Sequence, residues 1–472
     1  MTHSFVPLAD RLPPTACLVS VRSGRQLDAA GLAAAVASTS RQLESLGLAH
    51  GDRVVIGHAD PLDFLVAMFA AWQAGLVAVG VNPNLPAPEQ ANVIAAAGAR
   101  AWLGELRTTL PQPLPVASPA TPLGPDEPAL ILMTSGTTGR PKGIALSHAA
   151  LLARIAHNLA VIPELPLPSL CILPVFFGHG LIGNVLTPLL AGSTVYLWPG
   201  PAAAELRGFG DWLDRHEIGF MSSVPSFWKL ALRFSAPPTR PLARVHVGSA
   251  PLSRQHWEDI ARFSGTRNVF NMFGMTETAN WIAGGALDAP GAAAGFVGKP
   301  WGGELAVLGE DGAIVRSGRG EALVRSPSIM LGYWQRPDLD AEAFIDGWFR
   351  TGDIAELNAD GLTLVGRIKT EINRGGIKVQ AEEVDLLLER HPDVAEACAF
   401  GLPDPIAGEL VGAAIVLQPG IAFDPEAIKA WCRTMARPDA VPSRLFSLDV
   451  IPRNERGKLV RADIRRLVEA MP

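Results

Sequence analysis

The sequence predicts an α/β protein with a β-rich segment and a separate C-terminal unit. Strand and helix patterns alternate along the first hundred residues. Short strand patterns with glycine turns cluster between residues 295 and 365, and a new set of helices and strands begins near residue 381. At 472 residues the chain is longer than one ordinary core, so two or three domains are expected.

The first hundred residues alternate helical and strand patterns. An alanine-rich amphipathic stretch, Leu32–Leu46, ends at Gly47 and predicts a helix. It is followed by a strand at Arg53–Gly57, a helix at Phe64–Ala74 and a buried strand at Val77–Val81. This order is typical of a mostly parallel sheet covered by helices.

The middle of the chain continues this alternation and then becomes richer in strands. Leu110–Pro128 is rich in proline and predicts a surface connection, after which Ala129–Met133 is a short apolar strand. Further along, Gly295–Tyr333 and Gly361–Val365 are patterned as short strands between turns that contain glycine. A β-rich subdomain is therefore expected there.

The last hundred residues have the pattern of a small α+β unit. Ala381–Arg390 has apolar residues at helical spacing, and Asp424 followed by Pro425 is a typical helix start with the aspartate as cap. Strands are expected at Val411–Leu417 and Leu445–Val450.

The composition restricts the classes of function. Apolar residues make up 48% and charged residues 18%, which is typical of a globular protein. A net charge of −6 disfavours nucleic acid as a partner, which would need clustered excess cation. Four scattered cysteines without a CxxC pair fit a reducing compartment, and the first twenty residues lack the regions of a secretion signal. A cytoplasmic location is therefore expected.

One segment has the length of a membrane span. From Cys171 to Gly192 there is no Asp, Glu, Lys or Arg. The segment nevertheless contains Pro174, Pro188, four glycines and His179, and no basic residues flank it closely. We interpret it as buried sheet and pocket wall, and expect no membrane span.

A loop rich in glycine and hydroxyl residues at 134–143 is the strongest chemical signal. Glycines let backbone N–H groups turn toward an anion, hydroxyls add donors and a lysine adds charge, so the loop predicts a phosphate cradle. It differs from the loop of P-loop enzymes, because Pro141 precedes the lysine and a strand follows. A polar surface loop is the alternative. The residues expected to bind are Thr134, Ser135, Gly136, Thr137, Thr138, Gly139 and Lys142.

Three further motifs follow along the chain. They are Asn-Met-Phe-Gly-Met-Thr-Glu-Thr at 271–278, Trp-Phe-Arg-Thr-Gly-Asp at 348–353 and Pro-Arg-Asn-Glu-Arg-Gly-Lys at 452–458. With Thr-Ser-Gly-Thr-Thr-Gly-Arg-Pro-Lys-Gly at 134–143, they resemble the adenylate-forming superfamily of acyl-CoA and aryl-CoA synthetases, adenylation domains and beetle luciferases. The resemblance spans about Gly75 to Lys458, and the motifs occur in the family's order.

The resemblance implies a fold and a reaction. The fold has a large N-terminal region, residues 1–367, of two doubly wound α/β subdomains and a β-rich one, and a small mobile α+β C-terminal lid, residues 368–472. The reaction uses ATP and Mg²⁺ to convert a small carboxylic acid to acyl-AMP and pyrophosphate. A thiol, either CoA or the phosphopantetheine of an acyl or aryl carrier protein, then takes the acyl group and releases AMP.

The motif at 271–278 is implied to bind the nucleotide and the metal. By resemblance, Phe273 lies against adenine, Thr276 contacts the α-phosphate and Glu277 holds Mg²⁺, while Asn271 and Gly274 belong to the same nucleotide site. A carboxylate is a suitable hard ligand for this cation. Without the rest of the pattern, Glu277 would be interpreted as a solvated loop residue.

Two motifs are implied to serve the ribose and the hinge. Asp353 is expected to accept from both ribose hydroxyls, with a turn cap as its alternative, and Arg367 is expected at the ribose or phosphate. Lys369 occupies the family's hinge position between lid and large region. Gly375 and Gly376 match a loop that lines the family's pantetheine tunnel, and an ordinary glycine turn is the alternative.

The motif that ends at Lys458 matches the family's catalytic lysine loop. An ammonium that bridges a carboxylate and a phosphate is most effective where water is excluded. Only seven of the 40 basic residues are lysine, which also disfavours a casual surface role. The segment Gly332-Tyr333-Trp334 also fits the family and is interpreted as structural.

The resemblance implies that the acid binds between residues 176–180 and the segments near 223–228, 248–250 and 278–281. Phe176–Gly180 contains no aspartate to pair with an ammonium, which disfavours α-amino acids, and its aromatic residues suit an aryl or short to medium acyl acid. His179 could gate the thiol tunnel, bond the substrate or be a satisfied core histidine. Two rival functions stay open: an amide synthetase, and a nucleotide-binding module without turnover.

Overall fold

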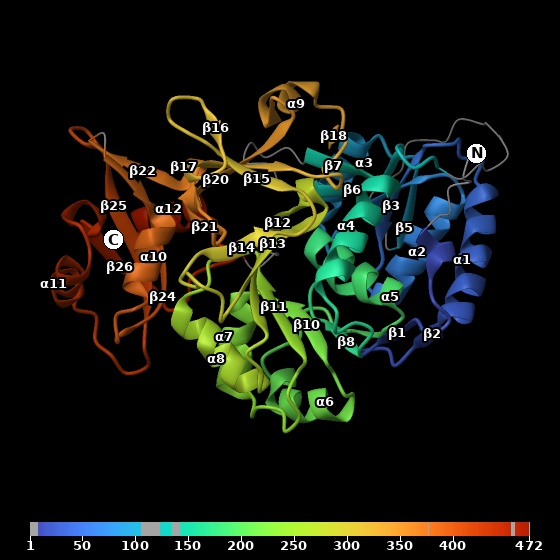
Figure 1. The fold of residues 1–472 in the computed structure, drawn as a ribbon, viewed down its shortest axis with the longest axis horizontal. Coiled ribbons are helices and arrows are strands. Elements are labelled where there is room, and N and C mark those ends of the chain that lie inside the picture. The colour runs from blue at the N-terminus through green and yellow to red at the C-terminus, as the bar shows by residue number, and fades with distance from the viewer. Residues whose placement is uncertain (1–7, 105–122, 135–141, 376, 455–457, 472) are drawn as a thin grey trace.

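The computed structural model describes residues 8–104, 123–134, 142–375, 377–454 and 458–471. These residues form three sheets, and the fold class predicted above is confirmed. Figure 1 shows the N-terminal sheet at one end of the molecule, the C-terminal unit at the other, and strands β10–β14 between them.

The first sheet contains the strands predicted near the N-terminus. Its order is β18-β7-β6-β4-β3-β5, and β5, β3, β4 and β6 run parallel. Apolar strands between helices lead to this arrangement because both faces of the sheet are covered. The strands are β3 (Arg53–Gly57), β4 (Val77–Gly80), β5 (Ala101–Gly104), β6 (Pro128–Thr134), β7 (Lys142–Ser147) and β18 (Gly332–Tyr333), and the helices are α1 (Ala29–Glu44), α2 (Pro61–Gln73) and α3 (Ala87–Ala97).

The second sheet is continuous with the β-rich part of the chain. Six parallel strands are followed by antiparallel strands that lead into the β-rich region. The parallel strands are β1 (Cys17–Ser20), β9 (Thr194–Leu197), β8 (Ser169–Cys171), β10 (Phe220–Ser223), β11 (Arg244–Gly248) and β12 (Val269–Met275). The strands that follow are β13 (Asn280–Ala286), β14 (Phe296–Pro300), β21 (Leu362–Arg367), β20 (Trp348–Leu357), β17 (Gly318–Arg325), β15 (Glu304–Leu308) and β16 (Ile314–Val315).

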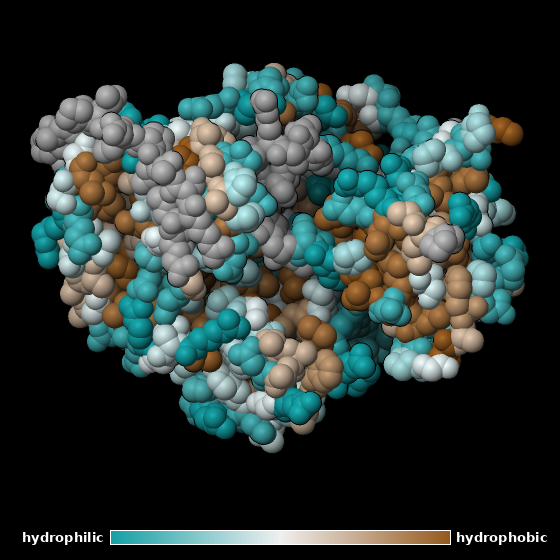
Figure 2. Space-filling view, turned by 180° about the vertical axis from the view of Figure 1, so that it is seen from behind, coloured by the Kyte–Doolittle hydropathy of each residue, from teal (hydrophilic) through white to brown (hydrophobic). Residues whose placement is uncertain are grey.

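The third sheet forms the C-terminal unit. Asp424 caps α11 by accepting hydrogen bonds from the N–H groups of Glu426 and Ala427, as the sequence predicts. In Figure 2, which shows the molecule from behind, apolar residues gather on the side of this unit, and exposed apolar side chains there include Ile406 and Val450. The elements are β22 (Glu371–Arg374), β23 (Ile377–Gln380), β24 (Val394–Asp404), β25 (Gly408–Leu417), β26 (Arg444–Ser447), α10 (Ala381–Leu388), α11 (Pro425–Met435) and α12 (Arg461–Glu469).

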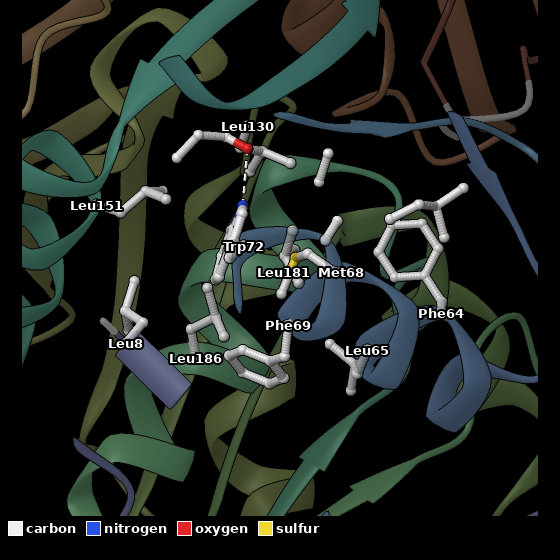
Figure 3. Packing of buried hydrophobic residues seen from close by; sticks show 14 of the residues in the cluster. Leu8, Phe64, Leu65, Met68, Phe69, Trp72, Leu130, Leu151, Leu181 and Leu186 are labelled. Carbon is white, nitrogen blue, oxygen red and sulfur yellow. Dashed lines mark hydrogen bonds between the residues drawn. The ribbon is translucent and has the colours of Figure 1, made fainter. Parts of the chain in front are cut away.

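The segment of membrane-span length is buried inside the protein. It begins in β8 and continues as a π-helix, η2 (His179–Leu186), and a short helix, α5 (Thr187–Ala191). Figure 3 shows Leu181 and Leu186 of η2 packed near Phe69 and Trp72 of α2. No helix among the described residues is long and apolar enough to cross a membrane.

The packing around α2 fixes η2 relative to the first sheet. The indole N–H of Trp72 donates to the carbonyl of Ala129 at 2.7 Å, which ties the helix to the start of β6 (Figure 3). Because eleven of its thirteen residues are buried, α2 lies inside the protein with apolar contacts on all sides. The beginning of η2, which carries His179, is therefore held by a rigid core.

Candidate active site

Glu277 lies where the second sheet meets the first. The strand β12 ends in a 3-10 turn, η4 (Thr276–Thr278), and the Glu277 carboxylate accepts a hydrogen bond from the Tyr333 hydroxyl at 3.1 Å. The ammonium of Lys142, on β7, is 3.7 Å from the same carboxylate and 4.1 Å from the centre of the Tyr333 ring. A carboxylate and an ammonium are thus placed together at the end of the predicted phosphate loop.

Tyr333 belongs to this site, although the sequence indicates only a structural role for it. It is 56 positions beyond Glu277, and β18 is brought next to β7 by antiparallel pairing of Tyr333 with Ile144. Burial, and then the neighbouring Glu277 carboxylate, raise the pKa of its phenol. Tyr333 is therefore a hydrogen-bond donor to Glu277. The signal that could have identified it is its position in the segment Gly332-Tyr333-Trp334, which also fits the family's pattern.

Positive charge converges near Lys142. Burial lowers the pKa of the Lys142 ammonium, the Glu277 carboxylate partly offsets this, and repulsion from Lys369 and Arg367 lowers the pKa further. Three cations from three different elements therefore lie within electrostatic reach of one another. The carboxylates of Glu277 and Asp353 compensate part of this positive charge, and a bound polyphosphate is an anion that would compensate the rest.

Asp353 is buried beside Arg367. The two residues are register partners on β20 and β21, and the Arg367 Nε lies 2.7 Å from the Asp353 Oδ1. Burial raises the pKa of the Asp353 carboxyl to about 6, against the opposing influence of the Arg367 and Lys458 charges. Near neutral pH the carboxylate is ionised and accepts hydrogen bonds, as the predicted ribose contact requires.

Lys458 reaches the large region from the C-terminal unit. Its charge acts to lower the pKa of both Asp353 and His179, so it lies within electrostatic reach of both residues. Its backbone N–H donates to the Asn454 Oδ1 at 3.0 Å, which helps to shape the loop that carries it. The last residue of the C-terminal motif therefore acts electrostatically on the predicted ribose ligand and on His179.

Both ring nitrogens of His179 are bonded within the protein. Nδ1 lies 2.9 Å from the Ser249 Oγ and Nε2 lies 2.8 Å from the Ser222 Oγ. Burial, and then the Lys458 charge, lower the pKa of the ring to about 3, so it is neutral. The ring also packs edge-on against Trp281, with centroids 5.7 Å apart. This is the arrangement of a histidine whose ring nitrogens both have partners within the protein, which is the third of the predicted alternatives.

The other residues predicted for the nucleotide and thiol sites have contacts that do not point to a ligand, or lie outside the described residues. The Asn271 amide donates to the Phe296 carbonyl at 2.9 Å, and Phe273 is buried in the β-rich core, so their nucleotide contacts stay predictions. A side chain at Gly274 would collide with the Asn280 carbonyl, which explains the glycine. Gly375 occupies an open turn with a φ of +61°. The residues Ser135, Gly136, Thr137, Thr138, Gly139 and Gly376, and the side chain of Thr134, lie outside the described residues.

The comparison with protein families is decisive. A model of AMP-binding enzymes matches residues 8–334, and a model of the C-terminal domain of AMP-binding enzymes matches residues 383–458. The chain belongs to the AMP-binding enzyme family. The two matches correspond to the large region and to the C-terminal unit of this AMP-binding enzyme.

Curated relatives and solved structures agree with this assignment. This AMP-binding enzyme is 32% identical to an oxalate–CoA ligase of Arabidopsis thaliana, and the match covers 90% of each chain. It is 31% identical to a feruloyl-CoA synthase of an Amycolatopsis species, and that match covers 97% of this chain and 96% of the relative. Its fold is similar to that of ATP-bound MatB from Rhodopseudomonas palustris, with a TM-score of 0.85, 24% identity and coverage of 98% and 99%. It is also similar to the amide bond synthetase McbA from Marinactinospora thermotolerans, with a TM-score of 0.83, 25% identity and 98% coverage of each chain.

Proposed function

We propose that this enzyme uses ATP to activate a carboxylic acid as its acyl-adenylate and transfers the acyl group to the thiol of CoA. The observation that carries the proposal is the convergence of Lys142, Arg367 and Lys458 on the carboxylates of Glu277 and Asp353. Cations suited to phosphate, an acceptor suited to ribose hydroxyls and a second carboxylate suited to a metal are together the groups that Mg·ATP requires.

In the first step, the acid's carboxylate oxygen attacks the α-phosphorus of ATP. A carbon–oxygen–phosphorus link forms, the bond to the β-phosphate oxygen breaks, and pyrophosphate leaves. Two anions are forced together, so the ammonium of Lys458 stabilises the charge that develops between them. In this proposal Lys142 and Arg367 hold the phosphates, and Thr276 donates to the α-phosphate. Glu277 is the residue that would hold Mg²⁺, which neutralises charge on the triphosphate when bound.

In the second step, the thiol attacks the activated carbonyl carbon. A carbon–sulfur bond forms, the bond to the phosphate oxygen breaks, AMP leaves, and the thiol proton is released. Lys458 has no charge to stabilise at phosphorus in this step. We propose that the C-terminal lid, residues 368–472, turns about Lys369 so that Gly375 and Gly376 approach the thiol. The boundary between residues 367 and 368 is part of this proposal.

The names of relatives support CoA as the acceptor. Ligases of oxalate, sulfoacetate and long-chain fatty acids to CoA are among the relatives, at 28–34% identity. Their acids differ widely, so the family does not define the acid used here. Phe176 and Phe177 pack edge-on in the expected acid segment, and the described residues of 176–180 include no carboxylate. An aryl or short to medium acyl acid therefore fits better than an α-amino acid.

A panel of acids scored by pyrophosphate release tests the proposal. Each acid is incubated with Mg·ATP alone, with CoA, with an acyl carrier protein bearing phosphopantetheine, or with a primary amine. The amine is included because the similar McbA is an amide bond synthetase. We expect pyrophosphate with an aryl or acyl acid, and AMP release that CoA accelerates more than the amine. Faster AMP release with the amine would favour amide synthesis, and no pyrophosphate with any acid would contradict the proposal.

A further inference from the structure

Two neighbouring ring N–H groups are buried in the second sheet without an acceptor. Within the described residues, His246 Nδ1 and Trp281 Nε1 are inaccessible to solvent and have no hydrogen-bond partner. Their rings pack edge-on with centroids 4.6 Å apart. A buried polar group without a partner is unfavourable and uncommon, and it calls for a reason in the protein's function.

The hydrogen on His246 can be assigned to Nδ1. The Arg244 Nε donates to the His246 Nε2 at 2.8 Å, so Nε2 provides the lone pair. Complete burial, then the charge of Arg244, keep the pKa of the ring far below its ordinary value, so the ring is neutral. A neutral imidazole with Nε2 as acceptor carries its hydrogen on Nδ1. His246 is therefore a donor polarised by a guanidinium on its other side.

His246 and Trp281 adjoin the part of the site where the acid is expected. His246 is the register partner of Ser222, so both side chains lie on the same face of the sheet. Ser222 is bonded to His179, and Trp281 packs edge-on against both His179 and His246. A side chain at Gly183 of η2 would overlap the Trp281 ring, so η2 lies directly against this ring. These residues form one continuous wall.

The charges behind this wall compensate each other. The Arg244 guanidinium, which is nearly inaccessible, lies 3.2 Å from the Glu164 carboxylate and stacks on the Phe270 ring at 3.8 Å. Asn268 also donates to Glu164 at 2.7 Å. Arg244 and Glu164 together carry no net charge, and the neutral His246 adds none. The wall therefore offers hydrogen-bond donors without offering a free cation.

We propose that the N–H groups of His246 and Trp281 recognise an uncharged hydrogen-bond acceptor in the tail of the acid, such as a hydroxyl, ether or keto oxygen. This inference rests on the proposed function and specifies the class of acid that the enzyme activates. A tail that bears a second carboxylate or a sulfonate is excluded, because a buried anion would have no counter-charge at this wall.

Matched pairs of acids test the proposal. Each parent acid is compared with acids of the same carbon skeleton that also carry a hydrogen-bond acceptor. Benzoate is compared with the three hydroxybenzoates, cinnamate with 4-hydroxycinnamate and 4-methoxycinnamate, and hexanoate with 5-oxohexanoate. Malonate and glutarate represent tails with a second charge. The readout is kcat/KM for pyrophosphate release. We expect at least one acceptor-bearing acid to exceed its parent by about tenfold or more, because a site built for a hydrogen bond rejects the analogue that lacks it.

Two variants connect this preference to the two donors. Trp281→Phe removes one N–H and keeps an aromatic ring. His246→Met removes the Nδ1–H, adds no other donor and keeps a weak sulfur acceptor on the side of Arg244. Each should reduce the ratio of kcat/KM for the acceptor-bearing acid to kcat/KM for its parent acid about tenfold. Trp102→Phe is the control, because it removes another buried indole N–H without a partner, in the first sheet. It should leave the preference unchanged.

The possible outcomes separate this inference from the proposed function. A preference that both variants reduce, and that Trp102→Phe does not, supports the inference. The inference is overturned if acids release pyrophosphate but no acceptor-bearing acid exceeds its parent, if malonate or glutarate is the best substrate, or if the preference survives in both variants. Absence of pyrophosphate with every acid contradicts the proposed function itself.

Discussion

Lys229 of the large region is joined to Glu389 of the C-terminal unit by an ion pair, with 2.9 Å between Nζ and Oε1. Lys229 lies on α7 (Pro225–Phe234), and Glu389 caps the C-terminal end of α10. The pair spans the two units in the same arrangement that brings the charge of Lys458 near Asp353 and His179. In the proposed mechanism, this ion pair therefore favours the arrangement used for adenylation.

Removing this ion pair should affect the two half-reactions differently. Partly exposed ion pairs contribute about 0.2–1 kcal/mol, so Lys229→Ala should lower the rate of acyl-AMP formation about 1.5-fold to fivefold. Thioester formation from premade acyl-AMP should be unchanged or faster, because the lid is less strongly held. Lys429→Ala is a matched control, since Lys429 pairs with Glu426 inside α11. Equal losses in both half-reactions would show that the pair serves folding alone.

Glu277→Gln tests the metal assignment. The amide oxygen can still accept from Tyr333, so the fold should be retained, but the neutral group binds Mg²⁺ poorly. We expect acyl-AMP formation to fall by roughly two to three orders of magnitude, with a higher Mg²⁺ concentration needed for half-maximal rate. Glu304→Gln, in an exposed ion pair with Arg316, provides the control. Activity of Glu277→Gln within twofold of the wild type would refute the assignment.

The raised pKa of Asp353 predicts how ATP binding depends on pH. The pKa in the free protein is about 6, so the carboxylate is ionised at pH 7.5 and mostly protonated at pH 5. The ionised form accepts from both ribose hydroxyls, so ATP affinity should fall as pH decreases through 6, by up to about tenfold per unit. Titration of ATP binding by calorimetry measures this. In Asp353→Asn the affinity for ATP should be low at every pH, and it should not show the fall near pH 6. If the wild type and the variant have identical pH profiles, Asp353 is not the group that causes the fall.

Arg461 connects the Lys458 loop to the rest of the C-terminal unit. Its guanidinium lies 2.6 Å from Asp385 and 3.0 Å from Glu382, and donates to the Ala399 carbonyl at 2.7 Å. Arg461→Ala leaves the buried Asp385 unpaired and should lower the free energy of unfolding by about 3–5 kcal/mol at pH 8.

Two comparisons check this prediction for Arg461. Burial raises the pKa of the Asp385 carboxyl to about 6. The loss in free energy of unfolding caused by Arg461→Ala should therefore be smaller at pH 5, because a protonated carboxyl needs no counter-charge. Arg466→Ala, which removes an exposed arginine from the same helix, should change stability by at most about 0.5 kcal/mol. Urea unfolding of both variants at the two pH values provides the measurement, and a loss in Arg461→Ala no larger than in Arg466→Ala would contradict it.

The parts of the fold predicted best from the sequence are those determined by local chemistry. The strand Arg53–Gly57 is predicted with its observed limits because an apolar run lies between turns, and α11 begins after Asp424 because that side chain caps it. The segment that contains His179 could be recognised as buried, but its π-helix has no sequence signal, since it depends on packing against α2.

The site was predictable where one motif carries it and unpredictable where distant residues meet. Glu277 and Asp353 stand in recognisable motifs. In contrast, Arg244 is paired with Glu164 across 80 positions, and Tyr333 bonds Glu277 across 56. Similarly, β1 pairs with β9, more than 170 residues later. Long-range pairings of this kind arise from the closure of the sheets, which no local pattern records.

The most direct test of the account measures both half-reactions in Lys458→Ala. The charge of Lys458 lies within electrostatic reach of Asp353 and His179, and in the proposed mechanism it is needed only while phosphorus is attacked. Acyl-AMP formation should fall by at least about a hundredfold, the scale for losing a preorganised charged donor. The same preparation, given premade acyl-AMP and CoA, should form thioester within a few-fold of the wild-type rate. If thioester formation falls as far as adenylation does, the assignment of Lys458 to the first step alone is wrong.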